Sequence, residues 1–132
     1  MTKHASGTFD VKLVPVGNSD NADGIALGGM NGTKEFQGDL KGTSIVQMLH
    51  SGTESAGSRA YVAIERVTGT LGGKRGSFVL MHRGSMTKAG QELIVIVAPE
   101  SGTGDLASIA GTLQIIIKDK KHFYEFDYTL PD

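Results

Sequence analysis

The chain lacks cysteine and tryptophan, and its charges nearly cancel. Among its 132 residues there is no cysteine, so disulfide bonds and thiolate metal sites are excluded. Its net charge of −1 leaves no basic excess for displacing counterions from phosphates. A nucleic-acid partner is therefore not expected.

Long hydrophobic runs are also missing. The longest, residues 93–98, is far shorter than the roughly 18 residues that a membrane helix needs. The first seven residues hold no apolar segment of the kind that forms a secretory signal. We therefore expect no membrane partner and a cytoplasmic location.

Glycine is abundant, at 19 residues, whereas proline occurs only three times. Glycine spread through a chain of ordinary hydrophobicity is typical of many strands joined by turns, and the length suits one domain over residues 1–132. Apolar residues alternate with polar ones along most of the chain. The predicted strands are residues 6–14, 30–37, 40–49, 60–70, 77–87, 91–98, 112–118 and 121–130.

This pattern predicts an all-β fold. Residues 17–24 are expected to form a surface loop, and residues 112–130 a hairpin rather than a helix, because β-branched and aromatic residues dominate there. About eight antiparallel strands in a meander can close into a single barrel. A barrel of this size has room for packed side chains or one small ligand.

A tight turn at Gly72-Gly73 fixes the register of its hairpin. Counting outward places Glu65 opposite Leu80, Ala63 opposite His82 and Tyr61 opposite Gly84. The face that this register defines is apolar except for three side chains that form a candidate polar site. Its members are Tyr61, Ala63, Glu65, Val67, Phe78, Leu80 and His82.

A carboxylate and an imidazole among apolar side chains suggest acid–base chemistry. In this hypothesis Glu65 is the general acid or base with a raised pKa, His82 relays or orients, and Tyr61 donates to a developing oxyanion. The reaction would be a cofactor-free isomerisation, cyclisation or hydration. The alternative is a purely structural cross-strand pair.

The last hairpin, with its turn at Asp119-Lys120, supplies a second interior face. Ile117 is expected opposite His122, Leu113 opposite Phe126, and Gly111 opposite Tyr128. The polar edges of this face would contact a ligand, unless its aromatic residues simply fill the core. The predicted ligand-contacting residues are Phe78, Leu80, Val67, His122, Tyr124 and Tyr128.

No metal or cofactor motif is present. The four histidines form neither a His-x-His nor a His-Glu-x-x-His pattern, and there is no phosphate-binding P-loop. A metal site built from His50, His82 and Glu65 across strands remains an alternative. We predict no cofactor.

The opposite face of the Gly72-Gly73 hairpin is also apolar. Val62, Ile64, Val79 and Met81 would lie outside the barrel if Glu65 lies inside. Because a large apolar face is usually buried against another protein surface, we expect a homo-oligomer, either a dimer or a trimer.

Several segments resemble an uncharacterised, mostly bacterial family of proteins of unknown function. The resemblance covers nearly the whole chain from Gly7 onward, in residues 36–40, 60–71, 76–86, 101–106, 111–112 and 122–128. It implies an allene-oxide-cyclase-like barrel, the fold of plant cyclases and dirigent proteins. It implies no activity, because fold likeness alone does not transfer a function.

Two functional hypotheses follow. The barrel binds, or acts on, a small and partly apolar molecule in its interior; or it is a structural or interaction domain with a filled core. An interior cavity of a few hundred cubic ångströms would favour the first.

Overall fold

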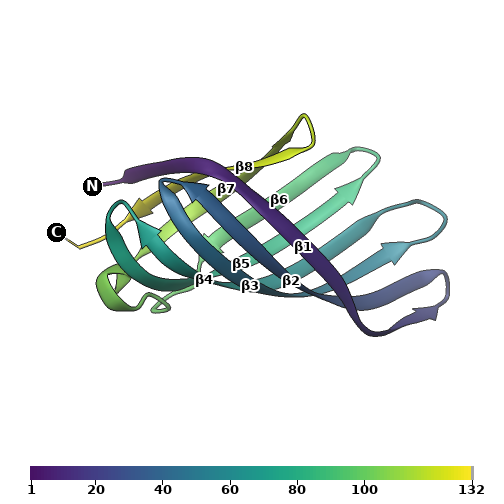
Figure 1. Ribbon diagram of the computed structural model, residues 1–132. Helices are drawn as coiled ribbons and strands as arrows, with labels where there is room; N and C mark the ends of the chain where they lie inside the picture. The colour runs from purple at the N-terminus through teal and green to yellow at the C-terminus, as the bar shows by residue number, and fades with distance from the viewer. Residues whose placement is uncertain (132) are drawn as a thin grey trace.

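The computed structural model describes residues 1–131 and shows a closed barrel of eight antiparallel strands, as predicted (Figure 1). Each strand pairs with its neighbour in sequence, and β1 pairs with β8 to close the barrel. Within the described residues the only helical element is the short 3-10 turn η1, Gly104–Leu106, and no helix could span a membrane. The strands are β1 (Lys3–Ala22), β2 (Ile25–Gly38), β3 (Leu40–Thr53), β4 (Arg59–Leu71), β5 (Lys74–Thr87), β6 (Gly90–Val97), β7 (Ala110–Lys118) and β8 (Lys121–Thr129).

The register predicted for two hairpins is confirmed. Glu65 pairs with Leu80 and Ala63 with His82 across β4 and β5. In the last hairpin Ile117 pairs with His122 and Leu113 with Phe126. In both hairpins the two-residue turn sets this register, since its residues adopt the positive φ angles that such turns need.

The surface loop predicted at residues 17–24 is wrong. Strand β1 continues to Ala22, and the turn is confined to Asp23 and Gly24, with φ angles of 55° and 77°. A bulge between Val16 and Asp20 shifts the register against β2. The polar residues of this segment therefore belong to a long, exposed hairpin. Because neither face of this hairpin is buried, its sequence does not alternate between apolar and polar residues.

One half of the barrel is closed and packed. It contains both chain ends and the turns β2–β3 and β4–β5 (Figure 1). The β6–β7 loop closes this end, and two of its own residues, Leu106 and Ile109, are buried. Gly76 allows the loop to approach, because a Cβ there would lie 2.1 Å from the Thr103 carbonyl oxygen. The largest fully buried apolar side chains here are Phe36, Leu40, Leu71, Phe78, Leu106, Tyr124 and Phe126.

The other half is splayed. Strand β1 pairs with β8 only as far as Phe9 with His122, whereas it follows β2 to Ala22. Between β6 and β7 only Ile96 and Thr112 pair. The hairpins therefore spread apart at this end (Figure 1), and the interior there is reachable from outside.

Candidate functional site

A buried charged cluster lies at the junction between the packed half and the splayed half. Glu65 is completely buried, at 0% exposure. Lys34 Nζ donates to its Oε1 at 3.0 Å, the Ser44 hydroxyl donates to Oε2 at 2.6 Å, and His82 Nε2 donates to Oε1 at 2.8 Å. We call these four residues the Glu65 cluster.

The cluster is assembled from four consecutive strands. Lys34 pairs with Ser44 across β2 and β3, and Ser44 pairs with Val67, two positions beyond Glu65 on β4. The ammonium of Lys34 lies 4.7 Å from the centre of the Phe9 ring, within cation–π range. The charge on Lys34 is thus held between an aromatic face and a carboxylate.

The expectation of a raised pKa for Glu65 is wrong. Burial does push the pKa of Glu65 upward, but three partners outweigh burial. The hydrogen bond from His82, the charge of Lys34 and the hydrogen bond from Ser44 hold the pKa below its ordinary value of 4.5. Glu65 is therefore a carboxylate at neutral pH, and its oxygens are occupied by donors, so it is poorly suited to act as a general acid.

His82 is oriented by this carboxylate. Its Nε2 is bonded to Glu65, whereas its Nδ1 has no hydrogen-bond partner within residues 1–131. In the same part of the chain every fully buried side-chain nitrogen and oxygen has a partner. The Nδ1 atom is therefore not fully buried.

Tyr61 lies above His82, with ring centroids 6.3 Å apart. Burial, followed by the charge of Glu65, raises the pKa of the Tyr61 phenol above its ordinary value of 10.0. Tyr61 is therefore a neutral hydrogen-bond donor across the physiological pH range. All three predicted catalytic residues lie on one interior face, as the register requires.

Above them the splayed half encloses a cavity of about 410 Å³, which we call the mouth cavity. Its apolar wall comes from Met30, Met48, Met86 and Leu93, and its polar groups include His50 and Tyr61. Methionine side chains are flexible and polarisable, so such a wall adapts to different shapes. The volume falls within the range of small-molecule sites.

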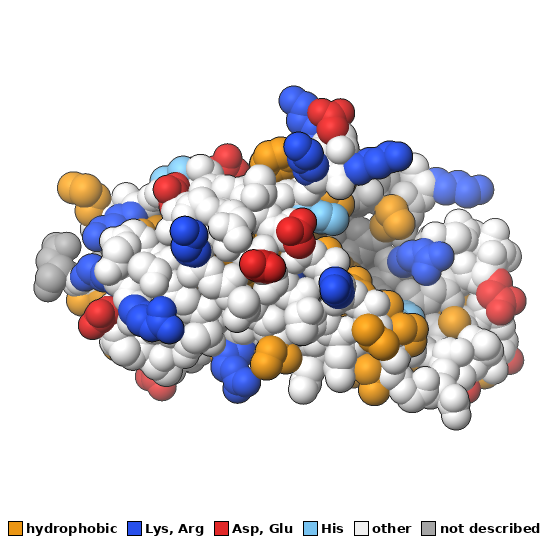
Figure 2. Space-filling view, in the orientation of Figure 1, with side chains coloured by type: hydrophobic (Ala, Val, Ile, Leu, Met, Phe, Trp, Pro, Cys, Tyr) orange, Lys and Arg blue, Asp and Glu red, His pale blue; other side chains and the backbone are white. Residues whose placement is uncertain are grey.

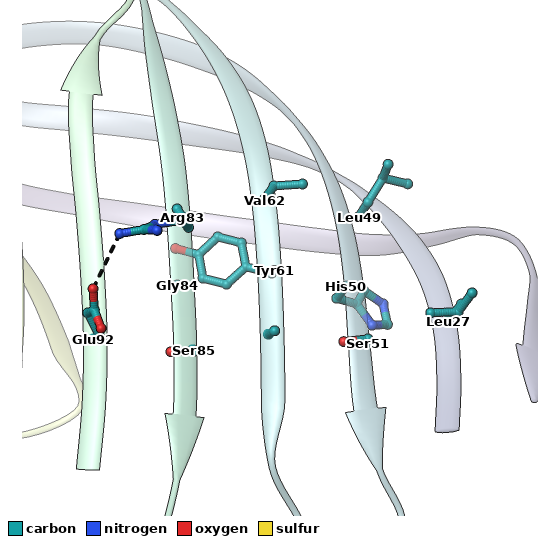
Figure 3. A pocket seen from close by; sticks show the side chains of 11 residues that line it. Leu27, Leu49, His50, Ser51, Tyr61, Val62, Arg83, Gly84, Ser85 and Glu92 are labelled. Carbon is teal, nitrogen blue, oxygen red and sulfur yellow. Dashed lines mark hydrogen bonds and ion pairs between the residues drawn. The ribbon is translucent and has the colours of Figure 1, made fainter. Parts of the chain in front are cut away.

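Two glycines make room for the polar groups of the mouth cavity. His50 and Tyr61 pair across β3 and β4, and their side chains lean away from each other. Each lies over a glycine of the strand on its own side. A Cβ at Gly84 would lie 2.3 Å from Tyr61 Cε1, and one at Gly28 would lie 2.9 Å from His50 Cε1. Figure 3 shows the Tyr61 ring reaching across toward Gly84. The space between the two rings is part of the mouth.

The predicted ligand-contacting residues lie elsewhere. Five of the six are in the buried core, while the ring of the half-buried His122 lies tilted against Phe9, with ring centroids 5.1 Å apart. None of the six borders the mouth cavity. The Tyr124 hydroxyl accepts a bond from Leu40 N and donates to Gln37 O, so it fastens the β2–β3 turn. The five core residues are Val67, Phe78, Leu80, Tyr124 and Tyr128.

The sequence analysis missed Lys34, Ser44 and the methionine wall. One signal was present: Lys34 shares the alternating face of Phe36 and Met30, so it is a charged residue in an apolar series. The alternative metal site is not formed, because residues 1–131 hold no group of three or more side chains able to bind a metal. His50 instead lies over Gly28 at the mouth.

Fold and interior together define a class: a small antiparallel barrel, packed at one end and hollow at the other, with a buried charged cluster between. The chain belongs to the DUF3224 family of proteins of unknown function, whose model matches residues 5–128. It is similar to a solved DUF3224 protein from Shewanella oneidensis MR-1, with 41% identity over 100% of both chains and a TM-score of 0.93. No curated protein matches it.

Proposed function

We propose that this protein binds a small, partly apolar molecule in the mouth cavity. The observation that carries the proposal is the 410 Å³ hollow with its methionine wall. A barrel built only as a scaffold would fill this space, as the packed half of the same barrel is filled by aromatic residues. The contrast between the two halves favours binding over a purely structural role.

The polar groups indicate where such a molecule would be oriented. Its apolar part would contact the methionines and Leu93. Its polar end would face His50 and the Tyr61 phenol, and the His82 ring lies next to Tyr61. The Glu65 cluster supports this end from below, because it fixes the ring orientation of His82.

The test is native mass spectrometry of the protein purified from its own host. The wild type is expected to retain a small molecule. Met48→Trp, which fills the cavity, should lose it, whereas the control Ile117→Trp on the exposed β7–β8 hairpin should keep it. An empty wild type, or equal retention by both variants, would reject the proposal.

A second candidate function is cofactor-free proton transfer at His82. It is favoured by the Glu65–His82 hydrogen bond, which leaves Nδ1 as the free proton acceptor in the neutral ring. Tyr61 would then stabilise negative charge that develops on the substrate. This revises the earlier hypothesis, because Glu65 orients the base instead of acting as the base.

Deuterium exchange separates binding from catalysis. If His82 abstracts a proton, the retained molecule should gain deuterium in D₂O with the wild type and not with His82→Gln. Equal incorporation with both proteins would leave binding as the only function.

A further inference from the structure

One positive charge on the inward face of the splayed half has no ion-pair partner within residues 1–131. Between the Glu65 cluster and the rim of the mouth, strand pairing places three charged side chains on the inward face of β2–β6: Lys34, Glu65 and Arg59. Lys34 and Glu65 neutralise each other within the cluster. The ion pairs of the described chain do not involve Arg59. With neutral histidines, this face therefore carries an excess of one positive charge.

Arg59 lies at the rim of the mouth cavity. It borders the 410 Å³ hollow, and it pairs with Gly52 on β3 and with Met86 on β5. The space over Gly52 is open, because the nearest atom to a Cβ there would lie 3.6 Å away. Figure 2 shows basic side chains beside a hollow in the splayed half. The guanidinium of Arg59 is therefore free to turn toward a molecule in the mouth.

The carboxylate that borders the mouth cavity is already engaged elsewhere. Glu92 is the acidic residue among those that line the cavity. Its Oε1 accepts a hydrogen bond from the Arg83 guanidinium at 3.3 Å (Figure 3). Both side chains alternate with inward-facing neighbours, so they point to the outside of the sheet. Glu92 therefore pairs with Arg83 and leaves the charge of Arg59 available to a ligand.

We propose that the molecule bound in the mouth cavity is an aromatic carboxylate and that Arg59 binds its carboxylate group. This inference rests on the proposed function and names the class of ligand. A guanidinium presents a planar fork of donors that matches the two oxygens of a carboxylate. The Tyr61 phenol, which its raised pKa keeps protonated, is a further donor on the same face. A ligand with one negative charge also balances the excess charge of the mouth.

The order of the inward-facing rows determines which end of the ligand lies deeper. The row of His50 and Tyr61 lies one step below Arg59, and the row of Met30 and Met48 lies one step below that. Each step is two residues along a strand, or about 7 Å. A carboxylate at Arg59 therefore stays near water while the apolar body reaches the methionines. Because methionine sulfur makes favourable contacts with aromatic rings, this wall favours an aromatic body.

An NMR titration of the methionine methyl groups tests this proposal, because the full chain has only five methionines. The two probes are phenylbutanoate and the corresponding primary alcohol, which has the same body without the charge. At neutral pH the wild type is expected to bind the acid about tenfold more tightly than the alcohol. Both probes should shift the signals of Met30, Met48 and Met86, which line the cavity. The signal of Met81, which faces outward on β5, should stay in place.

Arg59→Gln should lower the affinity for phenylbutanoate by about tenfold and leave the affinity for the alcohol unchanged. The matched control is Arg66→Gln, which removes an exposed arginine from the outward face of the same strand. This control should keep the preference of the wild type for the acid. Should Arg59→Gln fail to fold, Arg59→Thr decides by the same comparison.

Two results would overturn the inference and leave the mouth cavity standing as a binding site. They are equal affinity of the wild type for acid and alcohol, and an undiminished preference for the acid in Arg59→Gln. In both cases the alcohol still shifts the three cavity methionines. If neither probe shifts these signals in the wild type, the inference fails together with the proposed binding in the mouth cavity.

Discussion

Glu65 concentrates the electrostatics of this protein in one side chain. Its carboxylate neutralises the largely buried ammonium of Lys34, whose side chain is 9% exposed, and holds both His82 and Ser44. Removing one partner of a buried ion pair leaves an uncompensated charge. The cluster therefore matters to folding whatever its role in binding.

Glu65→Gln should lower the free energy of unfolding by about 3–5 kcal/mol at neutral pH, because Lys34 loses its counter-ion. Urea denaturation measures this change. The control is Glu35→Gln, an exposed neighbour on β2, where a change below about 0.5 kcal/mol is expected. Equal stability of Glu65→Gln and the wild type would show that the ion pair is not formed.

A comparison of the wild type with Glu65→Gln also gives a prediction about pH dependence. Because the pKa of Glu65 is lowered in the folded state, the stabilisation is present above the ordinary value of 4.5 and is lost as the pH falls through the lowered pKa. The stability difference between wild type and Glu65→Gln should therefore shrink only in strong acid. A difference that already disappears near neutral pH would contradict the lowered pKa.

Gly84 is expected to control the mouth cavity. In Gly84→Ala the new methyl group meets the Tyr61 ring, which must swing into the cavity to escape it. We predict loss of the retained molecule with little loss of stability, since a side chain moves and not the backbone. Native mass spectrometry and urea denaturation measure the two effects. Gly52→Ala is the control, because the nearest atom to its Cβ lies at 3.6 Å.

At the scale of elements, short turns made much of the fold predictable. The turns at Gly72-Gly73 and Asp119-Lys120 fix the register of two hairpins, and register alone places Glu65 and His82 on the interior face. Lys34 and Ser44 were missed because no register was worked out for β2 and β3. The difference between the packed half and the hollow half could not be predicted. It depends on unequal strand lengths and on the β6–β7 loop, and the alternation of apolar and polar residues encodes neither.

The seam between β1 and β8 closes the barrel, and His4 spans it. His4 Nδ1 lies 2.7 Å from Asp127 and its Nε2 contacts Glu125. The hydrogen bond to Asp127, then the one to Glu125, raises the pKa of His4 above 6.5. The protonated ring thus links β1 to two carboxylates on β8.

This seam should be sensitive to pH. Because the folded pKa is raised, the stabilisation is fully present below 6.5 and is lost as the pH rises through the folded value. His4→Gln should therefore be less stable than the wild type in acid and equally stable in mild alkali. Thermal denaturation of both proteins across this range tests the seam; a constant difference at every pH would show that protonation of His4 does not contribute.

At the scale of the whole molecule, the two ends of the barrel differ in how they are packed. The packed end, closed by Leu106 and Ile109, supplies most of the buried apolar surface and hence the stability. The splayed end buries less of its apolar surface in the core. Apolar side chains are instead exposed on both sides of one sheet. The inner side forms the mouth cavity, and on the outer side Leu49, Val62 and Ile64 are more than half exposed.

The most direct test of binding in the mouth cavity is a crystal structure of the protein purified from its own host. The account predicts density for a small molecule between Met30, Met48 and Met86, with a polar group facing His50 or Tyr61. A mouth filled only by ordered water, or closed by movement of the two rings, would contradict it.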